Sequence, residues 1–265
     1  VTTKSVRLLY DKAIEIGNIV KEGVKEADLV LSDKSNLTGN CIIAKAIVTE
    51  LQRQDIQIKL VSTAEDVGVE VSAGTRRCTA TQAKRIGKAA ARASNIKKLA
   101  RIDSRAIKLA PTGVAPQQNY GLQAQGASPS QVLQMRRNMK PATPVGGTQS
   151  CLTVTLEWFF GLHKDPFITA GADQINQWID LWKASSPLSK HRTRHFWRRK
   201  IHRLFFHPNK WSQSSGPTAA TICTLFDAGW YPVKPDAWLA PGEKWATITA
   251  APFAKAHILA QLKND

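Results

Sequence analysis

The segment TRRCTATQAKRIGKAAARASNIKKLARIDSRAIK, residues 75–108, decides the fold of the central part of this chain. Small and apolar residues recur in it at helical spacing: Ala83, Ile86, Ala90, Ala93 and Ile96 or Lys97. This pattern predicts an amphipathic helix from Ala80 to Leu99 whose basic side chains cover the remaining arc. The segment contains one acidic residue, Asp103. Its basic residues are Arg76, Arg77, Lys84, Arg85, Lys88, Arg92, Lys97, Lys98, Arg101, Arg105 and Lys108.

A polyanion is the expected partner of this basic surface. Each Lys or Arg that replaces a counterion condensed on a phosphate backbone adds a salt-sensitive increment of affinity, so RNA and DNA are the first candidates. The alternative is an ordinary solvated helical face. The excess of basic residues extends over the whole chain of 265 residues, which has a formal net charge of +17 and a pI near 10.0.

Composition also bounds the class of protein. With 43% hydrophobic residues the chain can bury a real core in one large or two modest domains. Its cysteines, Cys41, Cys78, Cys151 and Cys223, are far apart and show no zinc-ligand spacing, which favours an intracellular, reduced protein, either cytoplasmic or nuclear. No apolar run approaches the roughly 20 residues that span a bilayer, so no membrane partner is expected.

The first 74 residues predict a small α+β unit. A helical stripe of Val6, Leu9, Ala13, Ile16, Val20 and Val24 predicts a helix over 5–27, followed by a short strand, Leu29-Val30-Leu31, and a turn over 32–36. A second helix is expected over 40–53, and β-type runs over 56–61 and 67–71. Because the chain begins with Val and enters helical periodicity almost at once, we expect it to be a fragment of a longer polypeptide.

After residue 100 the pattern is mainly helical. A short helix is expected over 104–109 with a stop at Pro111-Thr112-Gly113, and a helix over 129–139 with Ser128 as N-cap and Pro129 at its first position. Residues 141–147, PATPVGG, predict a break or linker, and helices are expected over 152–160 and 170–184. The Pro- and Trp-rich tail shows too little periodicity for assignment.

A second basic island spans residues 190–210. It lacks acidic residues and contains Lys190, Arg192, Arg194, Arg198, Arg199, Lys200, Arg203 and Lys210, together with His191, His195, His202 and His207. Aromatic residues lie among these charges: Phe196, Trp197, Phe205 and Phe206. They suit base stacking or cation–π contacts, or else form the buried side of an amphipathic helix.

Residues for catalysis are scarce in the sequence. Glu65-Asp66 is the only adjacent acidic pair, and neighbouring side chains on a strand point to opposite faces. The histidines of the basic island lack a nearby carboxylate or cysteine, and the surrounding positive charge disfavours a divalent ion. No phosphate-binding loop, zinc-protease or hydrolase motif occurs. The residues alone therefore predict a binding protein without a metal site or cofactor.

The order of these elements resembles the C-terminal part of a reverse transcriptase of the non-LTR retrotransposon type. The resemblance rests on 29–35 (LVLSDKS), on the Asp66-Val67-Gly68-Val69 hairpin with Val in place of the usual Leu, and on two later segments. Residues 112–121 (TGVAPQQNYG) are similar to a motif after the first thumb helices, and 126–137 (GASPSQVLQMRR) to a following helix. The resemblance covers roughly Ser5 to Lys140.

The resemblance implies a role for several residues. Lys34 matches a lysine near the incoming nucleotide, Val67, Gly68 and Val69 would position the primer strand, and the basic helix would be a thumb helix tracking an RNA–DNA hybrid. The contacts to nucleic acid would come from Arg76, Arg77, Lys84, Arg85, Lys88, Arg92, Lys97, Lys98, Arg198 and Arg199. Lys34 is alternatively a solvated lysine in a turn. Residues 67–69 are alternatively an ordinary bend between two strands.

The metal-binding aspartates of such enzymes are missing from this chain. The family holds two magnesium ions with a "[FY]-x-D-D" turn and one upstream aspartate, and these residues would belong to an upstream palm and fingers portion of the same polypeptide. The chain is therefore expected to bind template–primer without transferring nucleotides alone. The expected fold is α+β, with a palm-remnant sheet (1–74), a helical basic thumb (75–140) and a basic, Trp-rich helical extension (141–265).

Two other functions remain open. The chain is alternatively a degenerate or repurposed nucleic-acid-binding protein without catalytic function, or a scaffold whose basic surface contacts acidic proteins.

Overall fold

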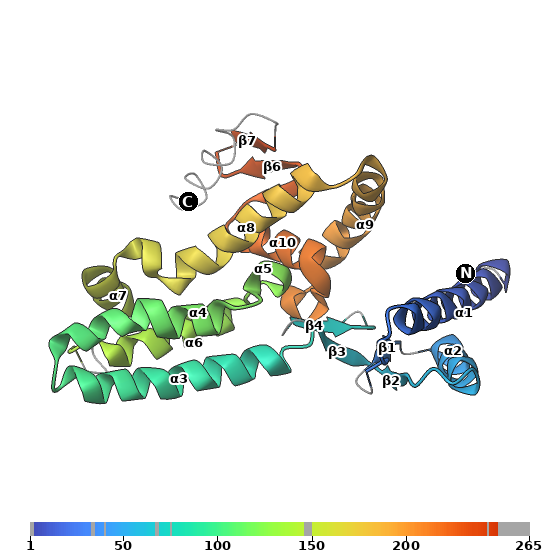
Figure 1. Cartoon of the computed structure of the whole chain (residues 1–265). Helices are drawn as coiled ribbons and strands as arrows, with labels where there is room; N and C mark the ends of the chain where they lie inside the picture. The colour runs from blue at the N-terminus through green and yellow to red at the C-terminus, as the bar shows by residue number, and fades with distance from the viewer. Residues whose placement is uncertain are drawn as a thin grey trace. The chain divides into compact units, whose positions relative to one another are not determined.

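The computed structural model describes residues 3–32, 35–39, 41–66, 69–74, 76–145, 150–242 and 244–248. The chain divides into two compact units, Val1–Cys78 and Thr79–Asp265. Both combine helices with small sheets, so the class is α+β with helices predominating (Figure 1). The further division expected near residue 140 stays a prediction.

The first unit contains two helices and two pairs of short strands in its described part. Their bounds are α1 (Thr3–Glu26), β1 (Asn36–Thr38), α2 (Ile42–Arg53), β2 (Lys59–Val61), β3 (Thr63–Asp66) and β4 (Val69–Ser72). β1 pairs with β2 in parallel, and β3 pairs with β4 as an antiparallel hairpin in which Asp66 lies opposite Val69. The core of this unit gathers Ile47, Leu51 and Ile56 under one side of α1.

The buried face of α1 differs from the expected stripe. Leu9, Ile16 and Val20 of the expected stripe are exposed, whereas Ala13 packs on the core together with Tyr10 and Ile14 from outside the stripe. Gly17 also faces α2, because a Cβ at this position would overlap the Leu51 side chain. Glycine thus permits the close approach of the two helices on this side of α1.

The expected strand Leu29-Val30-Leu31 is wrong. These residues form no strand, and Leu29 and Val30 are largely exposed. Asp28 has a left-handed φ of 53°, and the Leu29 N–H donates to the Val24 carbonyl, which closes the end of α1. The apolar tripeptide therefore continues the helix cap, and the first strand begins later, at Asn36.

The second unit is mainly helical. Its α-helices are α3 (Ala80–Ala100), α4 (Ala115–Asn119), α5 (Leu122–Gln125), α6 (Pro129–Met139), α7 (Leu152–Phe160), α8 (Pro166–Ala184), α9 (Pro187–Phe205) and α10 (Gly216–Asp227). Short 3-10 or π-helical turns are η1 (Ser104–Lys108), η2 (Ala110–Val114), η3 (Lys140–Ala142), η4 (Leu162–Lys164) and η5 (Lys210–Gln213). An antiparallel sheet of β5 (Tyr231–Lys234), β6 (Ala237–Ala240) and β7 (Lys244–Thr247) follows.

Separate apolar clusters hold this unit together. α3, α4 and α6 lie side by side (Figure 1) and share a cluster that includes Ala93, Val114 and Met139. α8, α9, α10 and the sheet enclose a second cluster rich in tryptophan: Trp178, Trp182, Trp197, Trp211, Trp230 and Trp238. The tail without sequence periodicity is thus a helix and a sheet folded over the tryptophans.

The α3 helix matches its expected start, but its buried stripe is rotated. The buried residues are Gln82, Ile86, Ala89, Ala93 and Ile96, whereas Ala83 is exposed. Alanine side chains are too small and too frequent in this helix to distinguish neighbouring faces by hydrophobicity alone. The packing against α4, α6 and η1 decides which face is buried.

The expected stop at Pro111-Thr112-Gly113 is wrong. The chain passes through the π-helical turn η2 directly into α4, and it leaves helical geometry only at Tyr120 and Gly121, where Gly121 has a φ of 84°. Pro111 is tolerated because it lies in the first turn, where its missing N–H has no intrahelical acceptor.

The start of the expected linker is also structured. Ala142 and Thr143 are buried, and Ala142 belongs to the cluster that α3 shares with α6. The N-cap at Ser128 is confirmed, because Ser128 and Gln131 form a capping box at the start of α6. Residues 146–149 lie outside the described part.

Candidate nucleic-acid interface

One face of α3 presents to solvent a stripe of residues that carries three lysines. It consists of Lys84, Lys88, Ala91, Asn95 and Lys98, all exposed, which we call the α3 stripe. These positions follow one another at intervals of three and four residues, and Lys84 to Lys98 spans about 21 Å along the axis. Within the described part of the chain, the Lys84 and Lys88 ammonium groups have no hydrogen bond or ion pair. Gly87, beside the stripe, has open space where a Cβ would stand.

Two arginines of α3 are engaged inside the fold. The Arg85 guanidinium lies 4.5 Å from the ring centroid of Tyr120 and donates to the Tyr120 carbonyl at 3.3 Å. The Arg92 Nη1 donates to the Gly113 carbonyl at 2.9 Å. Arg85 and Arg92 therefore attach α3 to the segment 112–121. In the first half of α3, Lys84 and Lys88 are the cations that remain available to a partner.

The other expected contact residues lie in different places. Lys97 and Lys98 are exposed in the last turn of α3. Arg76 is exposed and Arg77 half-buried, both at the end of the first unit. Val69 begins β4 in the hairpin, whereas Lys34, Val67 and Gly68 lie outside the described residues. The structure thus groups Lys84, Lys88 and Lys98 on one helical face.

The basic island forms α9, and its aromatic residues divide between core and surface. Trp197 is fully buried, donates its indole N–H to the Pro232 carbonyl at 2.8 Å, and fixes the helix on the sheet. Phe196, Phe205 and Phe206 remain exposed. Arg198 and Arg199 are exposed, with no internal partner in the described part. Burial, and then repulsion from Arg203, lowers the pKa of Lys200.

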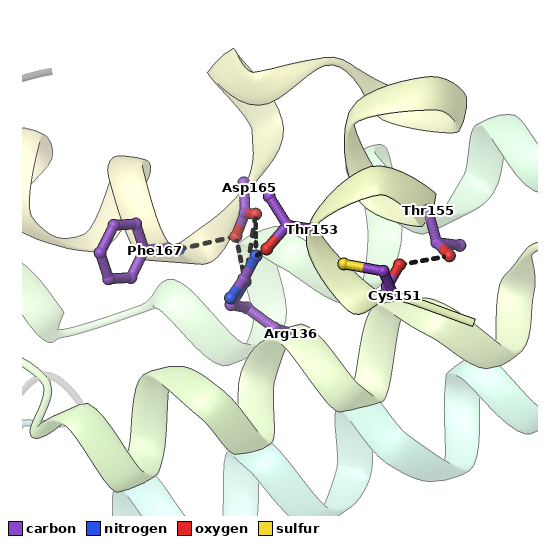
Figure 2. Close-up of polar contacts among 6 residues, drawn as sticks. All are labelled: Arg136, Cys151, Thr153, Thr155, Asp165 and Phe167. Atoms are coloured by element: carbon purple, nitrogen blue, oxygen red, sulfur yellow. Dashed lines mark hydrogen bonds and ion pairs between the residues drawn. The ribbon is translucent and has the colours of Figure 1, made fainter. Parts of the chain in front are cut away.

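Arg136 has a structural role that the sequence did not indicate. Figure 2 shows its guanidinium beside the Asp165 carboxylate, with Nε 2.9 Å from Oδ1 and Nη2 2.9 Å from Oδ2. Arg136 Nη2 also donates to Thr153 Oγ1 at 2.7 Å, and Asp165 Oδ1 accepts from the Phe167 N–H at 2.9 Å. This ion pair joins α6, α7 and the N-terminus of α8.

A buried amide network was likewise missed from the sequence. Gln82 Nε2 donates to the Gln118 carbonyl at 2.6 Å, Gln118 Nε2 to the Met135 carbonyl at 3.2 Å, and Asn138 Nδ2 to the Ile86 carbonyl at 3.0 Å. In the sequence, the only sign of this network is a polar residue at a position that the helical pattern places on the buried face. The network fixes α3, α4 and α6 relative to one another, and with them the α3 stripe.

Cys151 is exposed at the N-cap of α7, and the pKa of its thiol is lowered. The backbone N–H groups of Val154 and Thr153 favour the thiolate and lower its pKa, with smaller contributions from Arg136 and Lys140, although neither N–H completes a capping hydrogen bond to sulfur. Figure 2 shows Cys151 at this end of α7, where its carbonyl accepts from Thr155 Oγ1.

We expect iodoacetamide to alkylate Cys151 several-fold faster than Cys41 at neutral pH. Cys41 is a matched comparison, because it is also exposed and also precedes a helix. A lowered pKa means that the thiolate forms at lower pH, so the advantage is largest below the ordinary cysteine pKa of about 8.5 and disappears above it. Peptide mapping by mass spectrometry over a pH series measures both rates, and equal rates at neutral pH would contradict the assignment.

Among the described residues, no three His, Cys, Asp or Glu side chains form a group that could hold a metal ion. None of the helices in the described ranges combines the length and apolarity needed to cross a bilayer.

Comparison with known protein families, with curated proteins and with solved structures finds no match to this chain.

Proposed function

We propose that this chain binds nucleic acid, with the α3 stripe contacting the phosphate backbone of a duplex. One observation carries the proposal: the exposed face of a long helix without a single acidic residue presents lysines that have no partner in the described fold. A lysine ammonium held on a rigid helix and free of internal ion pairs is suited to replace a condensed counterion. The small residues Gly87 and Ala91 between the lysines permit close approach of a phosphate backbone.

The finer proposal is that the chain is the palm end, thumb and extension of a retroelement reverse transcriptase. The first unit, with its β3–β4 hairpin, would be the palm remnant, and α3 would be the thumb helix that follows it. Two features support this reading: the hairpin precedes a basic helix, and Arg85 and Arg92 attach that helix to the TGVAPQQNYG segment of the resemblance. In this role the chain grips template–primer, and an upstream portion supplies the aspartates with their magnesium ions.

The affinity for a labelled RNA–DNA hybrid, measured by fluorescence anisotropy at several salt concentrations, tests the proposal. Log K is expected to fall linearly with log salt, by about 0.7–0.9 per phosphate contact. The double variant Lys84→Glu/Lys88→Glu should reduce the steepness of this slope by about 1.4–1.8. If the two chains bind equally at 1 M salt, this corresponds to a loss of roughly 25- to 60-fold in affinity at 0.1 M.

A matched control separates specific contacts from net charge. Lys164→Glu/Lys183→Glu changes the charge of the chain equally at exposed positions outside α3 and α9, and it should leave the slope almost unchanged. Binding that ignores salt, or equal losses for both double variants, would overturn the assignment of the α3 stripe.

A second candidate is a nucleic-acid-binding protein without any polymerase role, and the compactness of the second unit, which holds both basic helices, favours it. The two candidates differ in the duplex they prefer. A thumb is expected to bind an RNA–DNA hybrid more tightly than a DNA duplex of the same sequence and salt, because it reads the wide minor groove of the A-like form. Equal affinity for both duplexes would leave only the second candidate.

A further inference from the structure

Four aromatic rings from three different elements gather at the C-terminal end of α9. They are Phe205 at the end of α9, Phe206 at its C-cap, Phe226 of α10 and Tyr231 of β5, which we call the aromatic ledge. The Phe205 ring centroid lies 5.0 Å from that of Phe206, 5.4 Å from Phe226 and 5.9 Å from Tyr231. The members are far apart in the sequence, so only the packing of α9 and α10 on β5 brings them together.

The ledge is open to solvent. Phe206 is 77% exposed, Phe205 54% and Tyr231 39%. The buried residues Trp197, Ile201 and Leu204 attach α9 to the fold, whereas three rings of the ledge keep much of their surface in solvent. Exposed aromatic residues gathered in this way mark an interaction surface.

Cations adjoin the ledge on the same side of α9. Arg198, His202 and Phe205 follow one another at intervals of four and three residues, as do Arg199, His202 and Phe206, so each set shares a face. Phe206 lies seven positions after Arg199, which is about 10 Å along the axis. α9 contains no acidic residue, and Arg198 and Arg199 have no internal partner in the described ranges.

We infer that the aromatic ledge and the adjoining arginines of α9 bind unpaired nucleotides of a single-stranded nucleic acid. Exposed rings stack on base faces, and guanidinium groups within two helical turns contact the phosphates of the same strand. A duplex cannot use the ledge, because its base faces are covered by the neighbouring base pairs. The inference rests on the proposed nucleic-acid binding and adds a second surface with a different substrate, separate from the duplex contact of the α3 stripe.

A lipid surface fits the ledge less well. An interfacial helix lays a continuous apolar stripe in the bilayer, whereas the apolar stripe of α9 is buried in the tryptophan core and its outward face carries Arg192, His195, Arg199 and His202. The positive charge of this face favours a nucleic-acid strand whose phosphates lie along α9 and whose bases stack on the rings of the ledge.

The test compares two ligands and three variants of the full chain. The ligands are a labelled oligo(dT) or oligo(U) of about 12 nucleotides and the RNA–DNA hybrid. Phe206→Ala removes the most exposed ring of the ledge, Phe206→Leu keeps an apolar side chain without a ring, and Trp158→Ala removes an 82% exposed ring from α7 as the control. Circular dichroism checks that each variant is folded.

Both Phe206 variants are expected to weaken oligonucleotide binding by roughly 5- to 100-fold, with hybrid affinity and the Trp158→Ala variant unchanged. Unchanged oligonucleotide binding in Phe206→Ala, or an equal loss for the hybrid, overturns the inference while the duplex proposal stands. A wild-type chain that binds neither ligand overturns both. Binding to anionic phospholipid vesicles that is lost in Phe206→Ala, without a change in oligonucleotide affinity, assigns the ledge to a lipid surface instead.

Discussion

Replacing Asp165 with alanine is expected to lower the free energy of unfolding by about 3–5 kcal/mol. The Asp165 side chain is 2% exposed and that of Arg136 14%, so removal of the carboxylate leaves a largely buried guanidinium without its counter-charge. The Phe167 N–H at the start of α8 also loses its acceptor. Urea denaturation followed by tryptophan fluorescence measures the change, because the core of the unit is rich in tryptophan.

An exposed ion pair in the same unit is the matched control. Asp103 and Arg105 are joined at 2.8 Å, and this contact lowers the pKa of Asp103, but both groups face solvent. Asp103→Ala should destabilise the chain much less than Asp165→Ala, because the ion pair and the N-cap hydrogen bond of Asp103 to the Arg105 N–H are both exposed to water. The double variant Arg136→Met/Asp165→Ala should be less destabilised than Asp165→Ala, because it removes the uncompensated charge. If Asp103→Ala and Asp165→Ala had equal effects, the ion pair would not hold the helices together.

Trp197→Ala is expected to cost a similar amount, about 3–5 kcal/mol. The ring is fully buried, its centroid lies 5.4 Å from that of Trp178, and its indole N–H bonds the Pro232 carbonyl. Alanine would leave a cavity between α8, α9 and the sheet and an unsatisfied carbonyl. Thermal or urea unfolding of the purified chain measures this loss.

The neighbouring residue provides the control for Trp197. Phe196 is exposed on the same helix, with the Lys200 ammonium 5.4 Å from its ring centroid, and Phe196→Ala should change stability by no more than about 0.5 kcal/mol. A stable Trp197→Ala variant would mean that α9 is not anchored by its tryptophan. The surface assignment of the arginines on that helix would then fail as well.

Local signals explain which elements were predictable. The helix over 80–99 and the helix that starts after Ser128 were found because periodicity and capping act within a few residues of the chain. The strand expected at Leu29-Val30-Leu31 failed because a strand needs a partner, and these residues have none among the described strands. The C-terminal sheet was missed because its strands are short and its attachment comes from distant helices: Trp178 and Trp197 donate to the Pro235 and Pro232 carbonyls, more than 30 residues later in the sequence.

That the chain is strongly basic and mainly helical in its centre can be predicted from its sequence, because charge and helical periodicity are properties of neighbouring residues. Which cations and rings remain available to a partner depends on tertiary contacts. Arg85 and Lys84 are adjacent in the sequence, yet a carbonyl and a ring 35 residues away engage the first and leave the second in solvent. Phe205 and Tyr231 likewise meet only because α9 and β5 pack together, since long-range contacts leave no signature in local spacing.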